Sequence, residues 1–288
     1  MITVFAPAKI NLFLHVTGKR PDGYHLLDTV TVFCKQTGDI IHIETAKALE
    51  FEVSGPFANG LPQDDGNIVI RAAYELARLC NKDLSVKIRL TKNMPVAAGL
   101  GGGSSDAAAC VKALLEYWNL NSAEVAGFND MLLSLGADVP ACFYAYPARG
   151  TGIGEKIERL KISFSMPAVI VNPLTPSITA DVFGQLESDH YSEEITDFPS
   201  TQTLPEFIDG LAQLGNDLYH TACRQNGDIA DVIAAIGQSE DCLLTRMSGS
   251  GASCYGLYES AEKAQAAKTR IQQSHPEWWV ASSLLGGA

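Results

Sequence analysis

The sequence predicts an α+β fold, and three observations support this prediction. Strand-like segments come in runs that are followed by helices, without the strict strand–helix–strand alternation of a parallel α/β sheet. The chain has 288 residues, and roughly 150 residues per domain would give two domains. Residues 147–156 contain two turn-forming residue types, Pro147 and three glycines, and have the composition of a linker. We therefore expect domains over 1–153 and 154–288.

The first half begins with strands. Residues 2–18 are rich in Val, Ile, Phe and Leu and predict two strands separated by a short break at Pro7, followed by a turn over 20–23. Asn67 is placed to cap a helix that runs to Leu79, because the apolar residues there recur at helical spacing. Further strands are expected over 29–33, 39–44, 51–53 and 85–90, and helices over 105–118 and 125–135.

The second half continues with mixed elements. Residues 187–206 are acidic and polar and contain two prolines, which predicts a surface loop. At least two helices are expected between 205 and 239. Strands are expected over 161–171, 243–247 and 253–258, and a helix over 261–273.

The charge balance restricts the class of partner. The chain carries 21 Lys and Arg against 33 Asp and Glu, a net charge of −12, which argues against nucleic acid or an anionic membrane as partner. Residues 1–150 hold 13 basic and 15 acidic side chains, whereas 151–288 hold 8 and 18, so the first half is better suited to anions. We expect a small-molecule substrate, and the sequence does not indicate an oligomeric state.

The cysteines and the apolar stretches indicate the compartment. The seven cysteines include no CxxC pair, which favours free thiols in a reducing environment. No stretch reaches the roughly 18 apolar residues of a membrane-spanning helix, and the first residues lack the pattern of a signal peptide. We therefore expect a cytoplasmic protein.

A glycine cluster lies between a predicted strand and a predicted helix. Residues 95–106 read PVAAGLGGGSSD. Glycines allow the backbone to approach an anion closely, and the free N–H groups of the following helix favour phosphate. The cluster is neither a Walker A loop nor GxGxxG. Ser104 and Ser105 can cap the helix or contact phosphate or a metal.

Three further features have ordinary explanations when each is taken alone. Lys9 lies in an apolar segment, where a lysine commonly extends its ammonium group to water. Asp138 follows a predicted helix and fits a turn. Residues 248–252 (SGSGA) fit a tight turn between strands.

The sequence does not indicate a metal site or a serine nucleophile. The histidines lack metal-binding spacing. The GxSxG pattern of serine hydrolases is also absent.

Taken together and in their order along the chain, these segments resemble a known set of sequence motifs. Residues 7–12 (PAKINL), 95–109 and 248–252 are similar to the three motifs of the GHMP kinase superfamily. Residues 18–25 (GKRPDGYH) and 135–140 (LGADVP) narrow the resemblance to the branch that acts on a cytidine-diphosphate-linked methylerythritol. Mevalonate and homoserine kinases share the glycine loop but lack the Gly-Tyr-His stretch.

This resemblance implies a fold and a reaction. It implies a two-domain GHMP kinase fold, with an N-terminal nucleotide domain similar to ribosomal protein S5, a C-terminal ferredoxin-like domain and the active site in the cleft between them. It also implies that ATP, with Mg²⁺, phosphorylates the 2-hydroxyl of the cytidine compound in the non-mevalonate route to isoprenoid precursors. Ser105 is a candidate metal ligand, although the sequence does not identify the side chain that binds the metal.

The resemblance also implies the site residues. Lys9 and Asp138 would be the catalytic pair. ATP would contact Pro95, Val96, Ala97, Ala98, Gly99, Leu100, Gly101, Gly102, Gly103, Ser104 and Ser105, with Asn67 and Lys92 near the adenosine. The substrate would contact Asn11, Tyr24, His25, Thr179 and Phe183. The third motif would contribute Gly249, Ser250 and Gly251.

Some points depart from the resemblance or stay open. Ala97 and Ala98 stand where many relatives have glycines, and residues 187–206 match no known segment. A kinase that acts on homoserine or mevalonate is an alternative, and the absence of a base to stack in those substrates makes Tyr24 and His25 the discriminating residues. A non-catalytic nucleotide-binding protein is a second alternative, but such a protein needs no general base.

Overall fold

A computed structural model describes residues 1–187, 191–196, 198 and 203–286. The chain forms two compact units, the first from 1–8, 38–96 and 101–145, the second from 9–37, 97–100 and 146–288. Strands β1 (Ile2–Lys19) and β2 (His25–Thr45) are long enough that each contributes residues to both units. The units are defined by contacts, so the division of the sequence at 153 and 154 stays a prediction.

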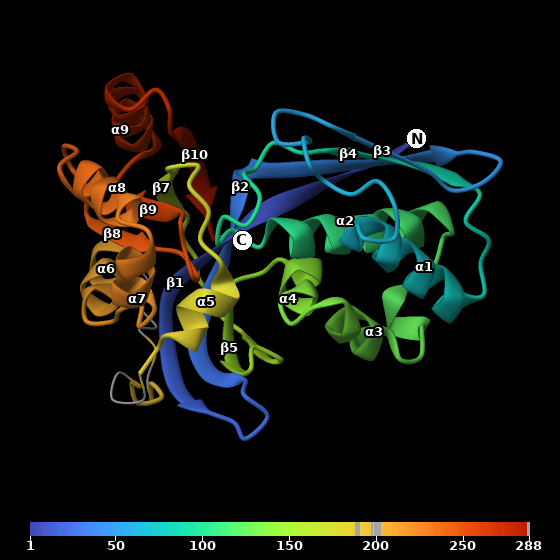
Figure 1. Cartoon of the computed structure of the whole chain (residues 1–288), viewed down its shortest axis with the longest axis horizontal. Coiled ribbons are helices and arrows are strands. Elements are labelled where there is room, and N and C mark those ends of the chain that lie inside the picture. Colours follow the sequence, from blue (N-terminus) through green and yellow to red (C-terminus); the bar gives the residue numbers. More distant parts are fainter. Residues whose placement is uncertain (188–190, 197, 199–202, 287–288) are drawn as a thin grey trace. The chain divides into compact units, whose positions relative to one another are not determined.

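The first unit contains a small sheet with helices on one side (Figure 1). Strands β3 (Glu50–Ser54) and β4 (Val86–Thr91) are parallel, and β4 runs antiparallel to residues 40–45 of β2. The helices are α1 (Ile68–Cys80), α2 (Gly102–Tyr117), α3 (Phe128–Leu135) and α4 (Val139–Tyr144), and a 3₁₀ turn covers Ser122–Glu124.

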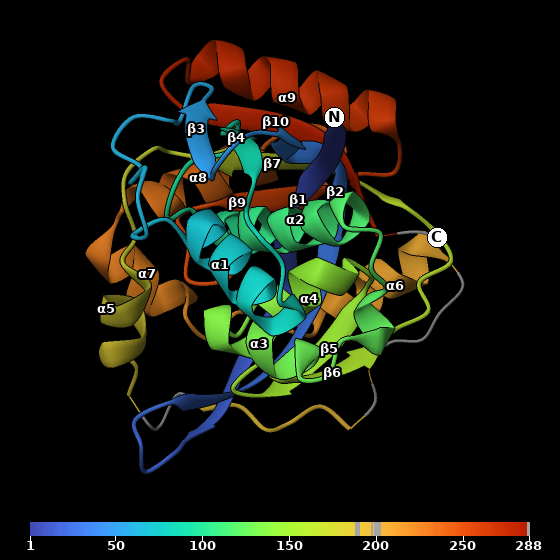
Figure 2. The same cartoon turned by 90° about the vertical axis from the view of Figure 1, so that its right-hand side faces the viewer.

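Helix α1 forms where the sequence predicts it. The side-chain oxygen of Asn67 accepts a hydrogen bond from the Val69 amide at 3.0 Å, which satisfies one of the free donors at the helix start. The apolar face of α1 is buried against α2, and Figures 1 and 2 both show the two helices side by side. Small residues in α2, Ala107, Ala108 and Ala109 among them, permit this close approach.

The second unit contains strands in the order β8–β9–β7–β10–β2, each antiparallel to its neighbour. Strand β1 also pairs with β2, and β5 runs antiparallel to both β2 and β6. Helices α8 (Asp228–Gly237) and α9 (Ala261–Ser274) pack on strands β7 to β10 (Figure 1). The strand bounds are β5 Ala148–Gly152, β6 Lys156–Arg159, β7 Met166–Asn172, β8 Leu244–Met247, β9 Cys254–Leu257 and β10 Trp279–Leu285. The shorter helices are α5 Thr179–Gly184, α6 Leu204–Ala212 and α7 Tyr219–Gln225.

Strands β7 to β10 with α8 and α9 form a ferredoxin-like arrangement. In chain order these elements read β7–α8–β8–β9–α9–β10, and the sheet order β10–β7–β9–β8 is that of the βαββαβ motif. Side chains from β7, α8, β9 and α9 bury one apolar core, which includes Val169, Ile236 and Ile271. The ferredoxin-like part of the expected fold is thus confirmed.

The structure differs from the expected elements at several places. The break at Pro7 is wrong, because β1 continues through it; the fixed φ of proline suits an extended strand. Residues 29–33 and 39–44 belong to one strand. Between them, the Gln36 amide donates a hydrogen bond to the Ser283 hydroxyl at 3.0 Å. Residues 147–156 are not an irregular linker, since they form most of the β5–β6 hairpin.

Helices α4 and α5 and strand β10 were also not expected. Helix α4 has six residues and a proline near its start, too short for a helical period to be visible. Strand β10 pairs with β7 over its whole length, yet its sequence WVASSLL does not alternate. No helix among the described residues is long and apolar enough to cross a membrane.

Candidate active site

The second unit brings parts of all three motifs into contact. The Lys9 amide donates to the Leu100 carbonyl at 2.8 Å, which joins the first motif to the glycine loop. The Asn11 amide donates to the Ser248 hydroxyl at 3.1 Å, and that hydroxyl donates to the Gly99 carbonyl at 3.0 Å. Segments that are far apart in the sequence therefore meet at one place.

Gly99 lies at the tightest point of this contact. Its φ is +72°, and an added Cβ would lie 2.5 Å from the Ser248 carbonyl oxygen and 2.7 Å from that of Gly251. Both conditions require glycine. Two residues earlier, Ala97 has φ +52°, a conformation that costs an alanine roughly 1–2 kcal/mol. Ala97 is one of the two alanines that stand where many relatives have glycines.

The third motif is held by side chains that sequence analysis missed. The Asn216 amide group donates to the Gly249 carbonyl at 2.8 Å. The Ser177 hydroxyl donates to the Ser250 carbonyl at 2.8 Å. The Thr179 hydroxyl lies 2.8 Å from the Ser250 hydroxyl, so Thr179, a predicted substrate residue, meets the third motif. Only the structure could reveal Asn216 and Ser177, because neither belongs to a recognisable pattern.

Lys9 and Asn11 lie two residues apart in β1 and so share one face of the strand. Both are buried, and Lys9 is only 6% exposed, so its ammonium group does not simply extend to water. The Asn11 amide group donates to the Thr29 hydroxyl at 2.8 Å, whereas its carbonyl oxygen is buried without a hydrogen-bond partner among the described residues. The structure therefore leaves one hydrogen-bond acceptor of Asn11 unused among the described residues.

A cluster of aromatic rings surrounds His25. The His25 ring lies 5.2 Å from that of Phe183 and 6.2 Å from that of Tyr191, measured between centroids. Burial, assisted by Lys19, lowers the pKa of His25, so the ring is neutral at neutral pH. Its Nε2 is buried and has no partner among the described residues. Tyr24 is 61% exposed, and Tyr191 was not among the predicted residues.

The first unit contains the other end of the glycine loop. Gly101 has φ +63° and stands directly before α2, whose first turn includes Gly102, Gly103 and Ser104. The first amides of a helix have no partner within it, so they can bind an anion. The Ser105 hydroxyl donates to the Pro7 carbonyl at 2.7 Å, and this bond fixes the start of the helix.

Asp138 belongs to the first unit, whereas Lys9 belongs to the second. Asp138 stands directly before α4 and is half-buried. Its carbonyl accepts the Cys142 amide at 3.0 Å, while its side chain does not cap the helix. The partnership of Asp138 with Lys9 stays a prediction.

Asn67 and Lys92, the two residues expected near the adenosine, have structural partners in the first unit. Asn67 caps α1, as described above, and its amide group donates to the Pro62 carbonyl at 2.9 Å. Lys92 is 3% exposed, and its ammonium group lies 2.5 Å from an Asp39 oxygen and 2.7 Å from an Asp106 oxygen. Their contact with ATP stays a prediction.

The Lys92 ammonium interacts with two buried carboxyl groups at the same time. Burial would lower the pKa of Lys92, but the charges of Asp106 and Asp39 outweigh it and raise that pKa, so the ammonium stays charged. Burial raises the pKa of Asp106 to about 8; the Lys92 charge opposes this and the Asp39 charge adds to it. Burial raises the pKa of the Cys110 thiol, and the neighbouring Asp106 adds to this.

This arrangement predicts a pH-dependent stability. Because the folded protein holds the Asp106 proton up to about pH 8 and the unfolded chain releases it near the usual value of 3.8, stability falls as pH rises through this interval. We expect Asp106→Asn, which stays neutral, to lose less stability than wild type between pH 6 and pH 8. Melting temperatures of both proteins across this range test this, and parallel curves would contradict it.

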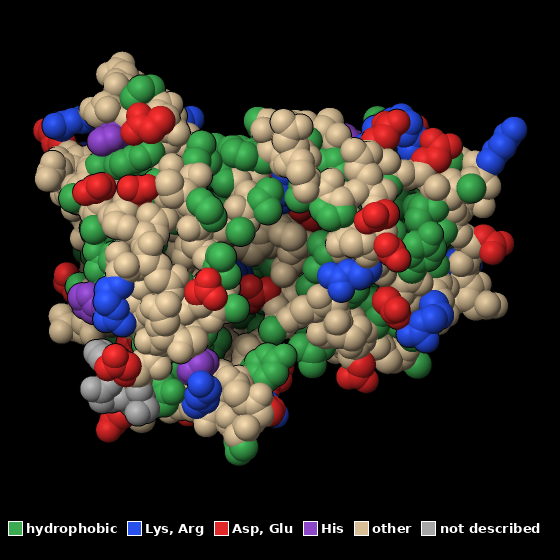
Figure 3. All heavy atoms as spheres, viewed as in Figure 1, with side chains coloured by type: hydrophobic (Ala, Val, Ile, Leu, Met, Phe, Trp, Pro, Cys, Tyr) green, Lys and Arg blue, Asp and Glu red, His purple; other side chains and the backbone are tan. Residues whose placement is uncertain are grey.

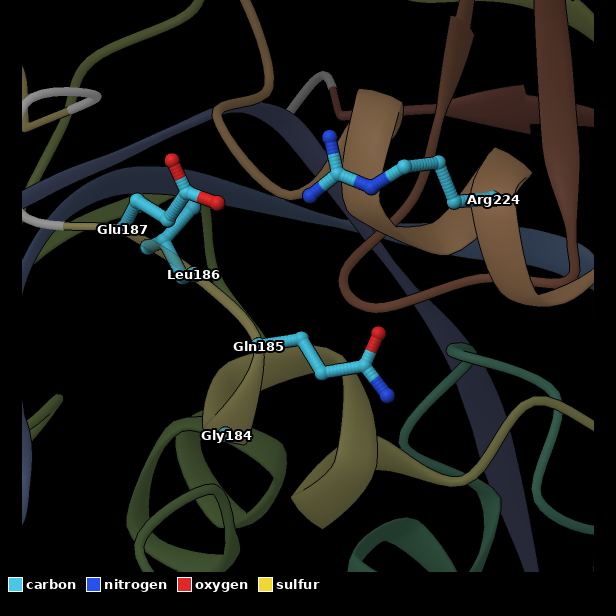
Figure 4. Close-up of a pocket in the computed structure, with 5 residues that line it drawn as sticks. All are labelled: Gly184, Gln185, Leu186, Glu187 and Arg224. Carbon is cyan, nitrogen blue, oxygen red and sulfur yellow. The ribbon is translucent and has the colours of Figure 1, made fainter.

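The described surface also contains a hollow apart from the predicted site residues. A hollow of about 590 Å³ beside α5 is lined by Gly184, Gln185, Leu186, Glu187 and Arg224, with Arg224 extending from α7 (Figure 4). It includes none of the predicted residues. Acidic and basic side chains are interspersed over the face shown in Figure 3. The described residues contain no group of three or more His, Cys, Asp or Glu that could hold a metal ion.

Comparisons with known proteins agree with this fold and these motifs. The family profile for the GHMP kinases N terminal domain matches residues 67–146, and that for the GHMP kinases C terminal matches 203–277. The fold and the three motifs thus define a GHMP kinase.

Individual relatives indicate to which branch of the GHMP kinases the chain belongs. The 4-diphosphocytidyl-2-C-methyl-D-erythritol kinase of Paramagnetospirillum magneticum is 42% identical over 283 residues, covering 98% of each chain. A crystal structure of 4-(cytidine 5'-diphospho)-2C-methyl-D-erythritol kinase superimposes with a TM-score of 0.82 at 29% identity, covering 100% of both chains. Homoserine kinase from Cytophaga hutchinsonii shares the fold, with a TM-score of 0.71 at 18% identity over 98% of this chain and 94% of its own. The chain belongs to the 4-diphosphocytidyl-2-C-methyl-D-erythritol kinases, and the predicted family and fold class are confirmed.

Proposed function

We propose that this protein transfers the γ-phosphoryl group of ATP to the 2-hydroxyl of 4-diphosphocytidyl-2-C-methyl-D-erythritol, a step of the non-mevalonate route to isoprenoid precursors. The observation that carries the proposal is the contact of the first motif, the glycine loop and the third motif through Lys9, Asn11, Leu100 and Ser248. Family membership supports the same acceptor. Both reactants are small molecules, and the free thiols support a cytoplasmic location.

In this reaction the protein positions the reactants and neutralises charge. The amides of the glycine loop and of the first turn of α2 would hold the phosphates of ATP. Asp138 would accept the proton of the attacking hydroxyl as general base. Lys9 would be its electrostatic partner and would stabilise the negative charge that develops on that oxygen.

The acceptor would be held by its cytosine end and by its polyol. Tyr24, His25 and Phe183 would form an aromatic pocket, because an aromatic face suits a pyrimidine ring and leaves its polar edge free. The unpartnered His25 Nε2 could bind that edge, since a neutral imidazole nitrogen either donates or accepts. Asn11 and Thr179 would bind the remaining polar groups of the substrate.

Mg²⁺ is expected with the ATP phosphates. This ion usually keeps several waters and takes few protein ligands, which fits a site without a cluster of three acidic side chains among the described residues. The Ser105 hydroxyl donates to Pro7 and keeps acceptor lone pairs, so it could bind the ion or its water. The ion would supply positive charge to the transferring phosphoryl group.

A substrate panel tests the proposed function. The purified protein is given ATP and Mg²⁺ with the cytidine compound, homoserine or mevalonate, and ADP release is followed. We expect turnover with the cytidine compound alone. Turnover only with homoserine or mevalonate would keep the kinase fold but contradict the aromatic pocket. Nucleotide binding without turnover on any of the three would favour a binding protein.

Tyr24→Ala tests the aromatic pocket. Because Tyr24 is exposed, its removal should leave stability unchanged. Loss of stacking should raise KM for the cytidine compound roughly tenfold, with a smaller effect on KM for ATP. Steady-state kinetics measure both constants, and exposed Tyr74 in α1 supplies the matched control, Tyr74→Ala. An unchanged KM for the cytidine compound would remove Tyr24 from the pocket.

A further inference from the structure

The glycine loop follows β4, which ends at Thr91, and enters α2 at Gly102, and both of its ends belong to the first unit. Near the start of the loop stands Asp39 of β2, which the antiparallel pairing of Ile40 with Thr91 places beside Lys92. One oxygen of Asp39 accepts the amides of Asn93 at 2.5 Å and Met94 at 2.9 Å. The start of the loop is therefore fixed by two hydrogen bonds to one carboxylate.

The far end of the loop is tied to the same group. The second oxygen of Asp39 lies 2.5 Å from the Lys92 ammonium, and that ammonium lies 2.7 Å from Asp106, in the second turn of α2. A Cβ on Gly102, the first residue of α2, would stand 3.0 Å from the same nitrogen. A single ammonium thus connects the start of the loop with the helix that ends it.

All three side chains are almost completely buried, so water does not compete for these bonds. Lys92 has only three donors, and two of them are already directed at carboxyl oxygens of Asp39 and Asp106. The remaining Asp106 oxygen is buried without a hydrogen-bond partner among the described residues. Packing between β2, β4 and α2 does not by itself require these polar groups, since apolar side chains of similar volume could fill the same space without ion pairs.

We propose that Asp39, Lys92 and Asp106 form a positioning clamp that holds the two ends of the glycine loop in the geometry that binds the phosphates of ATP. Lys92 acts on the nucleotide through the loop and does not need to touch it. The inference rests on the proposed function, because it takes the loop to be the nucleotide site. The advantage of such a clamp is that the loop amides need no reorganisation when ATP arrives.

The test measures ADP binding by titration calorimetry, which does not depend on the identity of the acceptor. Asp106→Ala releases the helix end of the loop and should raise the Kd for ADP roughly tenfold. Asp106→Asn keeps an acceptor for Lys92 and should restore part of the loss. Asp83→Ala, an exposed aspartate before β4, is the matched control and should bind ADP as wild type does.

A double-mutant cycle separates a clamp from two independent contacts. Asp39→Asn loosens the other end of the connection. Because both residues act through Lys92, the double variant Asp39→Asn with Asp106→Ala should weaken ADP binding little more than the stronger single change. Additive effects would overturn the clamp. In steady-state assays, KM for ATP should rise while KM for the cytidine compound stays the same, a split that a general loss of structure would not produce.

The outcomes distinguish this inference from the proposed function. Wild-type protein that binds ADP together with variants that bind it equally well would overturn the clamp alone. Wild-type protein that binds no ADP would overturn both. If Asp39→Asn does not fold, as its melting curve would show, the comparison of Asp106→Ala with Asp106→Asn decides, and equal affinities would contradict the clamp.

Discussion

Asp138→Asn is expected to lower turnover by about 10²–10⁴-fold while ATP still binds. The substitution keeps the size and shape of the side chain and removes its ability to accept a proton. The side chain of Asp138 does not cap α4, so the start of this helix does not depend on the carboxylate. Rapid-quench measurement of the chemical step, with ADP affinity measured on the same protein, tests this prediction.

A matched control separates the general base from a general effect of charge. Asp130 lies exposed in the first turn of α3, in the same unit, and Asp130→Asn removes one negative charge outside the proposed site. This variant should keep wild-type turnover. If Asp138→Asn also kept nearly normal turnover, the assignment of Asp138 as base would be wrong, and another group would have to accept the proton.

Gly99→Ala is expected to have the largest effect on stability. The φ of +72° costs an alanine roughly 1–2 kcal/mol, and its Cβ would lie within 2.7 Å of two carbonyl oxygens in the third motif. Overpacking of this kind costs roughly a further 1–3 kcal/mol, because backbone atoms on both sides must shift. We expect a fall in the free energy of unfolding of about 2–5 kcal/mol, together with weaker ATP binding.

The glycine cluster contains its own control for this experiment. Gly103 lies in the first turn of α2, and a Cβ there would meet Ile68 at an ordinary distance of 3.7 Å. Gly103→Ala should therefore leave stability unchanged or raise it slightly, since alanine favours a helix. Urea unfolding of both variants measures the difference. Equal stabilities would mean that the close contact between Gly99 and the third motif does not persist in solution.

Short-range patterns predicted the parts of the fold that depend on local chemistry. Asn67 was placed as a cap because its side chain acts on the next two residues, and the structure confirms it. The glycine loop before α2 was predicted for the same reason. Elements that depend on distant partners escaped prediction. Strand β10 exists because it pairs with β7, more than a hundred residues earlier, and its own sequence does not alternate.

In the candidate site, too, residues within local sequence motifs could be predicted, whereas residues that act through distant contacts could not. Motifs with a sequence signature, such as those at Lys9 and Gly99, were predicted, and their contact in the second unit agrees with the resemblance. Asn216 supports the third motif from a loop without a signature, so only tertiary structure identifies it. Asp39 and Asp106 read as ordinary polar residues in the sequence, and their shared partner Lys92 is visible only when β2, β4 and α2 are folded together.

We expect this chain to phosphorylate a hydroxyl group of the cytidine-linked methylerythritol. Phosphorus NMR of the reaction mixture with ATP, Mg²⁺ and 4-diphosphocytidyl-2-C-methyl-D-erythritol tests it most directly. We expect a new phosphomonoester resonance that grows as the ATP signals convert to those of ADP, while the diphosphate link of the acceptor stays intact. Conversion of ATP without a phosphomonoester on the acceptor, or cleavage of the diphosphate link, would contradict it.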